Sequence, residues 1–353
     1  MDNQNQNQTH KRRVRYKGTH PRSFHEKYKE HNPEKYADTI EKVIRKGSTP
    51  AGMHISICVN EILDFLQIKP GQKGLDATLG YGGHTKAMLN CLEGNGHIYG
   101  LDIDPIEIEK TTARLRQQGY GEEVLTVINT NFANLSEVAR QHGPFDFILA
   151  DLGVSSMQID NPERGFSYKI DGPLDLRLNP QEGVSAAERL TELSEEEFAW
   201  MMIENSDEPY AHEIAQTVMR ELRSGKKVDT TTRLRELIEK ALIKLPEKER
   251  KEAVKKSCQR TFQALRIDVN SEFEVLYAFL DALPDALAPG GRAAILTFHS
   301  GEDRLVKKSF KQLKKQGIYT EVCEDVIRPS VQECAMNPRA KSTKMRWAVR
   351  SDV

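Results

Sequence analysis

The sequence lacks the features that would place it in a membrane or in a disulfide-stabilised fold. None of its apolar runs reaches the ~20 residues that a helix needs to cross a bilayer. The first residues, MDNQNQNQ, are polar and contain no apolar core of the kind found in signal peptides. The five cysteines are odd in number and form no C-x-x-C pair, which argues against a zinc site or a disulfide framework. These absences predict a cytoplasmic protein with reduced thiols, no membrane partner and no metal requirement.

Charge is abundant but almost balanced. Charged residues make up 29% of the 353 residues, and the net charge is −1. Between His10 and Gly47, however, twelve Lys or Arg stand against five Asp or Glu, a net charge of +7. Such a segment on a near-neutral chain indicates a polyanionic partner, although a solvated, partly helical tail has the same composition. We expect residues 1–53 to form a basic, partly disordered arm.

Beyond the arm, strand and helix patterns alternate, which predicts an α/β fold with a parallel sheet and helices on both of its faces. The expected strands cover 73–78, 97–103, 124–129 and 145–150, and helices are expected at 59–66, 84–92 and 105–117. The alternation resumes with a helix at 269–283, a strand at 292–298, a helix at 302–317 and a strand near 344–349.

The alternation is interrupted by a stretch that is helical only, from about 186 to 256. Ser194 and Glu197 have the spacing of a capping box, and an apolar stripe with helical spacing lies between Leu234 and Leu245. We therefore expect an inserted all-helical subdomain at 181–258, which separates two parts of one domain at 54–180 and 259–353.

A glycine-rich turn follows the first strand and indicates a cofactor site. Gly80, Gly82 and Gly83 let the backbone approach a ligand closely, although a purely structural turn would use the same residues. Asp102 ends the next strand about 20 residues on, where a carboxylate takes the hydroxyls of a ribose. Asp76 would repel a phosphate and suit a cationic amino group, which favours S-adenosylmethionine over a dinucleotide.

Four further blocks are polar, glycine-bearing or arginine-rich, and the first follows the fourth strand directly. They are DLGVSSMQID at 151–160, RGFSYKIDGPLDLR at 164–177, RTFQALRIDVN at 260–270 and TFHSGEDR at 297–304. Together with DATLGYGGH at 76–84 and NPR at 337–339, they resemble the bacterial 16S rRNA cytosine-N4 methyltransferase family, called RsmH or MraW. The resemblance runs in order over residues 54–350.

The resemblance implies a class I (Rossmann-like) S-adenosylmethionine-dependent methyltransferase sheet with a helical insertion. It implies cofactor contacts at Gly82, Gly83, His84, Asp102, Phe132, Asp151 and Gln158, beside Asp76 and Gly80 of the glycine turn. Phe132 lies just past the third strand, where it would pack on adenine, or it is an ordinary core residue. The implied partner is 16S rRNA or the small ribosomal subunit, and the sequence leaves open whether the chain is a monomer or a homodimer.

The chain also departs from the family's pattern. Ser56 replaces a proline, and Gly301 replaces the leucine of F-H-S-L-E-D-R. Residues 206–209 (SDEP) replace G-E-E-R, and 256–259 (KSCQ) replace H-P-A-T. The arm is an addition to the family's usual start. These changes leave open a paralogue with a different RNA target.

For the reaction we expect Asp151 to contact the cofactor and to accept a hydrogen bond from the amine that is methylated, with backbone carbonyls of 152–155 as further acceptors. A base must leave its stack to reach such a site. The candidate substrate residues are Ser155, Arg164, Phe166, Tyr168, Asp175, Arg177, Arg260, Arg266, His299 and Arg304. Each arginine would serve equally in a structural ion pair, His299 as a structural histidine, and Asp175 as a turn residue.

Three other functions remain open at this stage. One is methylation of a different nucleic acid, such as 23S rRNA or DNA. Another is a non-catalytic ribosome-assembly factor that holds S-adenosylmethionine as a structural ligand, against which the intact glycine turn, Asp102 and Asp151 argue. The third is an oxidoreductase with a dinucleotide cofactor, which the glycine spacing disfavours.

Overall fold

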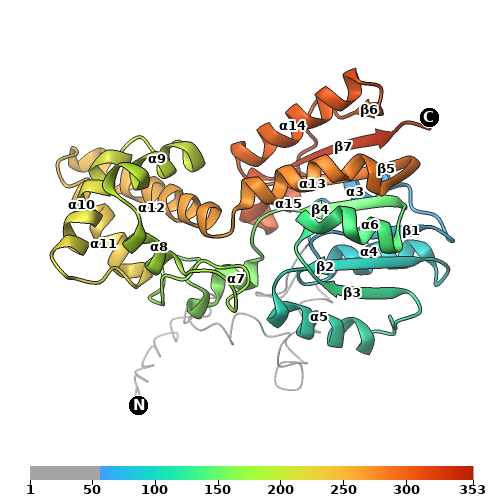
Figure 1. The fold of residues 1–353 in the computed structure, drawn as a ribbon, viewed down its shortest axis with the longest axis horizontal. Helices are drawn as coiled ribbons and strands as arrows, with labels where there is room; N and C mark the ends of the chain where they lie inside the picture. The colour runs from blue at the N-terminus through green and yellow to red at the C-terminus, as the bar shows by residue number, and fades with distance from the viewer. Residues whose placement is uncertain (1–55, 353) are drawn as a thin grey trace, which may run out of the picture. The chain divides into compact units, whose positions relative to one another are not determined.

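The computed structural model describes residues 56–352 (Figure 1). The predicted basic arm at 1–53 lies outside the described residues. None of the described helices has the length and apolar character needed to cross a membrane.

Seven strands form one mixed sheet in the order β3-β2-β1-β4-β5-β7-β6. Their bounds are β1 Lys73–Asp76, β2 His97–Asp102, β3 Leu125–Asn129, β4 Phe145–Asp151, β5 Leu287–Thr297, β6 Tyr319–Val322 and β7 Lys344–Arg350. β1 to β5 pair in parallel, whereas β7 runs antiparallel to both β5 and β6. The expectation of a parallel sheet is therefore wrong for β7. Side-chain patterning carries no strand direction, and β6 was not predicted.

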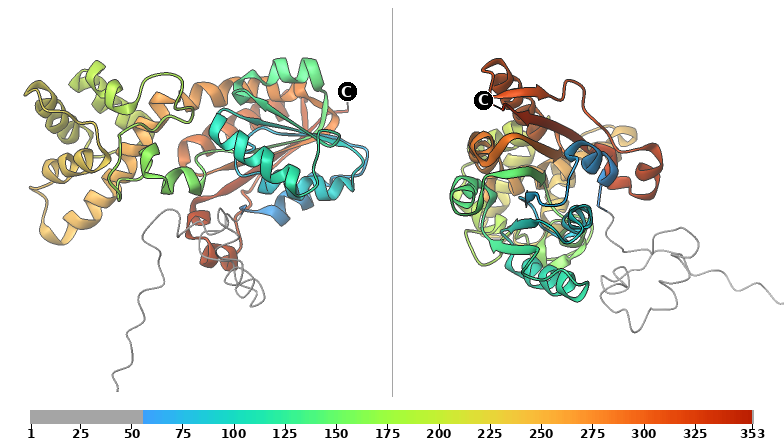
Figure 2. Two further views of the ribbon diagram at one scale, coloured as in Figure 1. Left: turned by 90° about the horizontal axis from the view of Figure 1, so that it is seen from below. Right: turned by 90° about the vertical axis from the view of Figure 1, so that its right-hand side faces the viewer.

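Helices cover both faces of the sheet because its central strands are apolar on both sides (Figure 2). In β4, Ile148 and Ala150 belong to one core and Phe147 and Leu149 to the other. Such a continuous apolar run is typical of a strand that is buried on both faces. One core takes α6 Leu135–His142, α13 Glu272–Ala286 and α14 Ser300–Lys315, and the other takes α3 Val59–Leu66, α4 Gly83–Leu92 and α5 Pro105–Gln117.

The helical stretch has a hydrophobic core of its own. It comprises α8 Ala186–Glu192, α9 Glu195–Ser206, α10 Ala211–Arg223, α11 Thr231–Ala241 and most of α12 Glu247–Val269. Ser194 and Glu197 do form the predicted capping box at the start of α9. Short elements complete the described fold: η2 Phe132–Asn134, α7 Ser156–Asp160, η3 Pro162–Arg164, α15 Val331–Met336 and η4 Pro338–Ser342.

The helical core is wider than the predicted subdomain at 181–258. It includes Leu174 and Leu176, which precede the predicted subdomain in the sequence, and Phe262 and Leu265, which follow it. Residue 258 lies inside α12, which continues without a break to Val269. For that reason the helix predicted at 269–283 begins only at Glu272, after a turn at Asn270 and Ser271. One long helix thus leads from the helical core back to the sheet.

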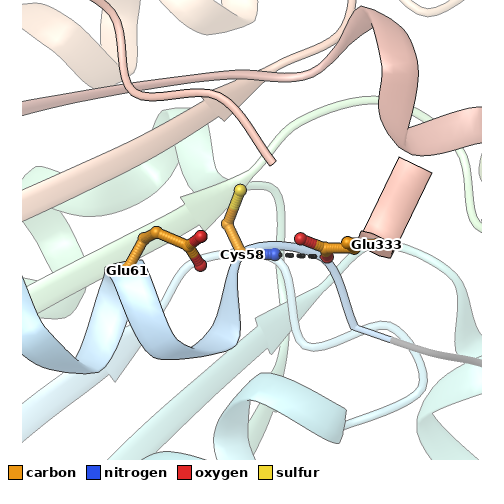
Figure 3. A group of neighbouring side chains, drawn as sticks. All are labelled: Cys58, Glu61 and Glu333. Atoms are coloured by element: carbon orange, nitrogen blue, oxygen red, sulfur yellow. Dashed lines mark hydrogen bonds between the residues drawn. The ribbon is translucent and has the colours of Figure 1, made fainter. Parts of the chain in front are cut away.

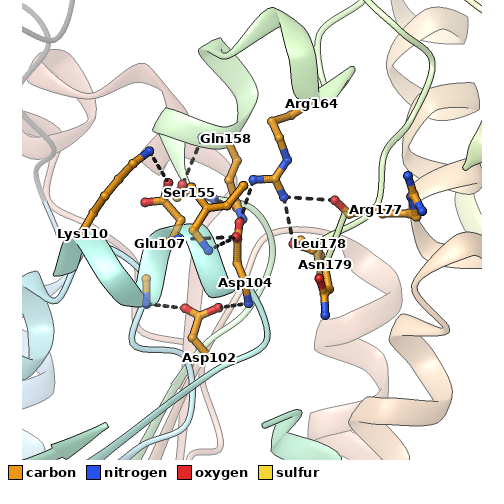
Figure 4. A network of polar contacts seen from close by, with 12 residues as sticks. Asp102, Asp104, Glu107, Lys110, Ser155, Gln158, Arg164, Arg177, Leu178 and Asn179 are labelled. Atoms are coloured by element: carbon orange, nitrogen blue, oxygen red, sulfur yellow. Dashed lines mark hydrogen bonds and ion pairs between the residues drawn. The ribbon is translucent and has the colours of Figure 1, made fainter. Parts of the chain in front are cut away.

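A buried carboxylate ties the sheet to the segment that enters the helical core (Figure 4). Asp104 caps α5, where its Oδ1 accepts from the amide of Ile106 at 3.0 Å. Its Oδ2 accepts from Gln158 Nε2 at 3.0 Å and from Arg164 Nη1 at 2.7 Å. Arg164 in turn donates through Nη2 to the carbonyl oxygens of Arg177 and Leu178, at 3.1 and 2.8 Å.

This network overturns one sequence-based assignment. Arg164 is only 7% exposed and its partners all lie within the protein. It therefore holds the chain together and does not contact RNA phosphates as expected.

Replacing Arg164 tests this structural assignment. Arg164→Leu leaves the charge of Asp104 buried without its partner, and we expect a loss of about 3 kcal/mol in the free energy of unfolding. Urea denaturation followed by circular dichroism measures it. Arg304→Leu is the control, because Arg304 is exposed on α14 and should change stability by no more than about 0.5 kcal/mol. Equal stability of the two variants would contradict the assignment.

Candidate functional site

A cavity of about 690 Å³ lies beyond the carboxyl ends of the parallel strands. Its walls include Thr78 after β1, Asp102 at the end of β2, Thr130 after β3, Asp151 at the end of β4 and Phe298 after β5. Open α/β sheets bind ligands at this edge, and the volume lies in the range of about 300–1,000 Å³ found for small-molecule sites. The cavity is therefore the candidate site.

The glycine turn forms one wall of the cavity, as predicted. Gly80, Gly82 and Gly83 line it, and the amide of Gly80 donates to Asp102 Oδ2 at 2.7 Å. Gly82 has φ +78, and a β-carbon there would lie 2.8 Å from Thr111 Cγ2. Only glycine fits this position without strain, so the turn stays narrow and its backbone faces the cavity.

Asp102 lies at the centre of the turn's hydrogen bonds. Its Oδ1 accepts from the amide of Asp104 at 2.9 Å, while Oδ2 binds Gly80. Burial raises the pKa of Asp102 to about 6. Each carboxylate oxygen has a second lone pair, so both remain able to accept from the hydroxyls of a ribose.

Asp76 is not placed as expected. It is 1% exposed and is not among the residues that line the cavity. Its Oδ1 accepts from the amide of Thr78 at 3.1 Å, and its Oδ2 from the Thr85 hydroxyl at 2.6 Å. Asp76 therefore holds the glycine turn against α4, and the prediction that it contacts the cofactor's amino group is wrong.

Asp151 and His84 lie together in the cavity wall. His84 Nδ1 is 3.5 Å from Asp151 Oδ2, and His84 Nε2 is 2.9 Å from the carbonyl oxygen of Ile57. Burial raises the pKa of Asp151 to about 6, although the nearby imidazole lowers it. Asp151 Oδ1 is shielded from solvent and has no hydrogen-bond partner among the described residues. Because Asp151 lines the cavity, a ligand bound there can supply the missing donor.

Phe132 and Gln158, the other predicted cofactor contacts, both line the cavity. Phe132 packs edge-on against Phe279 of α13, with 5.2 Å between the ring centroids, and is only partly buried. The amide group of Gln158 is already bound, because Nε2 donates to Asp104 and Oε1 accepts from the amide of Ser155. Gln158 is thereby fixed in the wall, and its amide keeps one N–H group and one lone pair for a ligand.

Three of the ten candidate substrate residues line the cavity: Ser155, Arg177 and Arg266. Ser155 caps α7 through its hydroxyl. Asp175 does not line the cavity, but it holds the guanidinium of Arg177 by two hydrogen bonds of 2.9 and 2.7 Å. Glu272 holds Arg266 in the same way, at 2.7 and 2.9 Å.

The remaining candidates lie elsewhere. Phe166 and Tyr168 are partly buried and pack against the helical core, where Tyr168 meets Phe262 edge-on, and neither lines the cavity. Arg260 is 3.8 Å from the buried Glu208 in the helical unit, and Arg304 is exposed on α14. His299 Nε2 is 3.2 Å from Glu302 Oε1, and its ring is 11% exposed, behind the cavity wall.

Several cavity residues were not singled out from the sequence. They include Phe298, Asn270, Glu272, Glu302 and Arg339. Asn270 accepts from the amide of Leu178 at 2.8 Å. It thus fixes residues 177–178, here called the strap, whose carbonyl oxygens accept from Arg164. Arg339 is 2.8 Å from Asp160. All five lie in or next to the blocks shared with the family. That position is the feature of the sequence from which they could have been identified.

Within residues 56–352, two groups of side chains have metal-ligand chemistry: Cys58, Glu61 and Glu333 (Figure 3), and Glu272, His299 and Glu302. In the first, Glu333 Oε1 accepts from the amide of Cys58 at 2.8 Å, and burial raises the pKa of the thiol to about 12. In the second, Glu272 is already paired with Arg266. We assign no metal to either group.

The chain matches known proteins over almost its whole length. The profile of the MraW methylase family matches residues 51–351. A relative named "Ribosomal RNA small subunit methyltransferase H 1" from Lachnoclostridium phytofermentans is 69% identical over 348 residues, covering 99% of this chain and 95% of the relative. A relative of the same name from Agathobacter rectalis is 66% identical over 343 residues, covering 97% of this chain and 98% of the relative.

More distant relatives match a shorter part of this chain, and the unmatched part is about as long as the predicted arm. "Ribosomal RNA small subunit methyltransferase H" from Heliobacterium modesticaldum is 37% identical over 313 residues, covering 84% of this chain but 97% of the relative. Together these matches show that the chain belongs to the MraW methylase family, and the fold class and the cofactor, S-adenosylmethionine, that the resemblance implied are thereby confirmed.

Proposed function

We propose that the protein methylates the exocyclic N4 amine of a cytosine in the small-subunit ribosomal RNA, at the decoding centre. The observation that carries this proposal is Asp151, whose shielded Oδ1 lacks a donor at the edge of the cavity. An exocyclic amine supplies such a donor. The names of the relatives support small-subunit rRNA as the substrate.

The cofactor fits the residues that are present. Bound S-adenosylmethionine supplies a methyl group already activated by its sulfonium. The backbone of Gly80–Gly83 and the carboxylate of Asp102 would hold its ribose side, and Phe132 would pack on its adenine. Two acids with raised pKa values, Asp102 and Asp151, line this cavity. A cationic ligand relieves the cost of ionising them, which favours this cofactor over an anionic dinucleotide.

The protein's main task is to place a weak nucleophile in line with the methyl group. The N4 lone pair of cytosine is delocalised into the ring, and a hydrogen bond from N4–H to Asp151 Oδ1 would orient the amine and help it to pyramidalise. Holding reactants in this way removes much of the entropic barrier. After transfer the nitrogen is acidic, and its proton passes to Asp151 or to water.

The basic arm is proposed as an additional RNA contact. Its net charge of +7 between His10 and Gly47 suits phosphates, and such segments can order on binding. Relatives that match over nearly the whole chain extend through it. We expect truncation of residues 1–46 to weaken RNA binding and reduce its salt dependence, measured by filter binding at several salt concentrations. Unchanged affinity and salt slope would reject this contact.

The first test of the function compares N4-methylcytosine across the rRNA of a strain lacking the gene with that of its parent. We expect loss at one decoding-centre cytosine of the small-subunit RNA. Loss at a different site would mean a paralogue with another target. If no site changes, the alternative of a non-catalytic assembly factor gains support.

Asp102→Asn tests the cofactor site. Removing a charged acceptor of the ribose hydroxyls should weaken S-adenosylmethionine binding about 10- to 100-fold, because hydrogen bonds to charged groups contribute about 1.5–3 kcal/mol. Isothermal titration calorimetry measures it. Asp64→Asn, on the exposed side of α3, is the matched control and should bind normally. Wild-type affinity in Asp102→Asn would exclude this assignment.

The pH dependence tests Asp151. Its pKa is raised to about 6, so it is neutral at lower pH and becomes an acceptor as the pH rises. We expect kcat/KM for RNA, at saturating cofactor, to rise with pH and to level off by about pH 7, with its midpoint below 6 because the bound cationic cofactor favours the ionised carboxylate. Asp151→Asn should be slow at every pH, with a flat profile. Cofactor affinity measured over the same range separates the titration of Asp102, and a wild-type profile that is flat would count against Asp151.

A further inference from the structure

A base that leaves its stack to be methylated needs a new surface to stack on. The loop directly after β4, DLGVS at 151–155, contains no aromatic residue. Phe166 and Tyr168 pack against the helical core and do not line the cavity. Phe132 lies past β3, on the side of the cavity assigned to adenine. Tyr81 also lines the cavity, but it belongs to the glycine turn of the cofactor site, and the guanidinium of Arg114 lies over its ring at 3.5 Å. The stacking surface for the substrate must therefore come from another element.

β5 brings an aromatic ring next to Asp151. The two strands pair in parallel, with Asp151 opposite Leu296, and the amide of Leu152 donates to the carbonyl oxygen of Leu296 at 3.1 Å. Phe298 follows two residues later, just as Gly153 follows Asp151. The ring therefore stands beside Gly153, one step beyond the Asp151–Leu296 pair and on the same face of the sheet, so the ring and the carboxylate are diagonal neighbours at one edge of the cavity.

The side chain of Phe298 is partly covered by the core and partly open to the cavity. It packs against the core that contains α3 and α4, yet it is only partly buried and lines the cavity. Gly153 leaves space beside it, since a β-carbon at Gly153 would lie 3.5 Å from Phe298 Cδ2. A planar group that enters the cavity can therefore reach the ring without meeting a side chain at position 153.

The backbone of Phe298 is fixed from behind. Glu302, which is 3% exposed, accepts from the amide of Phe298 through Oε2 at 2.8 Å. Its other oxygen, Oε1, is 3.2 Å from His299 Nε2. The ring of Phe273 fills the space beside Gly301, where a β-carbon would come within 2.7 Å of Phe273 Cζ. Phe298 is thus held by a packed layer, as a stacking surface needs to be.

From this geometry we propose that Phe298 is the surface on which the target base stacks while Asp151 accepts a hydrogen bond from its amine. The assignment rests on the proposed base methylation. It identifies the ligand of the substrate subsite as a single unpaired nucleobase. Phe298 would contact the face of that base, and Asp151 its amine-bearing edge. Stacking tolerates any base, so selection of the amine falls to Asp151.

The test compares Phe298→Leu, Phe298→Tyr and the wild type. Leucine keeps an apolar side chain for the core but removes the aromatic face, whereas tyrosine keeps the face. Methyl transfer is measured on small-subunit RNA from a strain lacking the gene, and cofactor affinity by calorimetry. We expect Phe298→Leu to lower kcat/KM for RNA about 10- to 100-fold, with cofactor affinity within about twofold of wild type. Phe298→Tyr should recover most of the loss.

Two results would overturn the proposal: wild-type kcat/KM in Phe298→Leu, or a Phe298→Tyr variant no better than Phe298→Leu. Equal losses of cofactor affinity and of methyl transfer would also reject it, because they indicate a general change of the pocket. The labelled product is digested and its nucleosides identified. Label on a nucleoside other than N4-methylcytidine would contradict the proposed function alone, and the ratios between the variants would still decide the role of Phe298.

Discussion

The buried carboxylate of Asp104 is the interaction on which the site depends. A charge removed from water is tolerated only where its hydrogen bonds and its counter-ion are all in place. Here the partners come from three places: the start of α5, α7 through Gln158, and η3 through Arg164. Because a half-formed network would be costly, these segments should form together. Asp102, two residues earlier, is thereby set at the cavity, and the strap at 177–178 is set across from it.

The acids at the cavity differ in what surrounds them, and this separates their roles. Asp151 has an imidazole 3.5 Å away and a bare second oxygen, and its pKa is raised. The side chain of Glu302 is more deeply buried, at 4% exposed against 23% for Asp151, and burial alone would raise its pKa. The pKa is lowered nevertheless, because His299, Arg266 and the amide of Phe298 stabilise the ionised form. Glu302 is thus a fixed charge that holds the backbone. Asp151 retains the capacity to respond to a cationic cofactor and an incoming amine.

The sequence predicted those parts of the fold and site that local patterns encode. Alternating strands and helices placed the glycine turn, Asp102 and Asp151 at one edge of a sheet, and the structure has them there. It could not reveal ion-pair partners distant in sequence. From the sequence, Arg164 was expected to contact phosphates, because its partner Asp104 lies 60 residues away in the chain and is brought beside it only by the fold. The direction of β7 and the true extent of α12 likewise depend on tertiary packing, and Phe298 could be identified only once β5 was known to lie beside β4.

The departures from the family pattern meet one another in space. Ser257 donates to Glu208 at 2.8 Å, which joins the altered block at 256–259 to the altered block at 206–209. Gly301, in place of a leucine, leaves the room that Phe273 fills. Both contacts lie in the packed interior, and neither Glu208 nor Ser257 lines the cavity. Ser56, which replaces the family's proline, does line it, beside Gly83 of the glycine turn. A shift of RNA target therefore has two routes: this wall of the cavity, or surfaces away from it, of which the basic arm is the clearest candidate in the sequence.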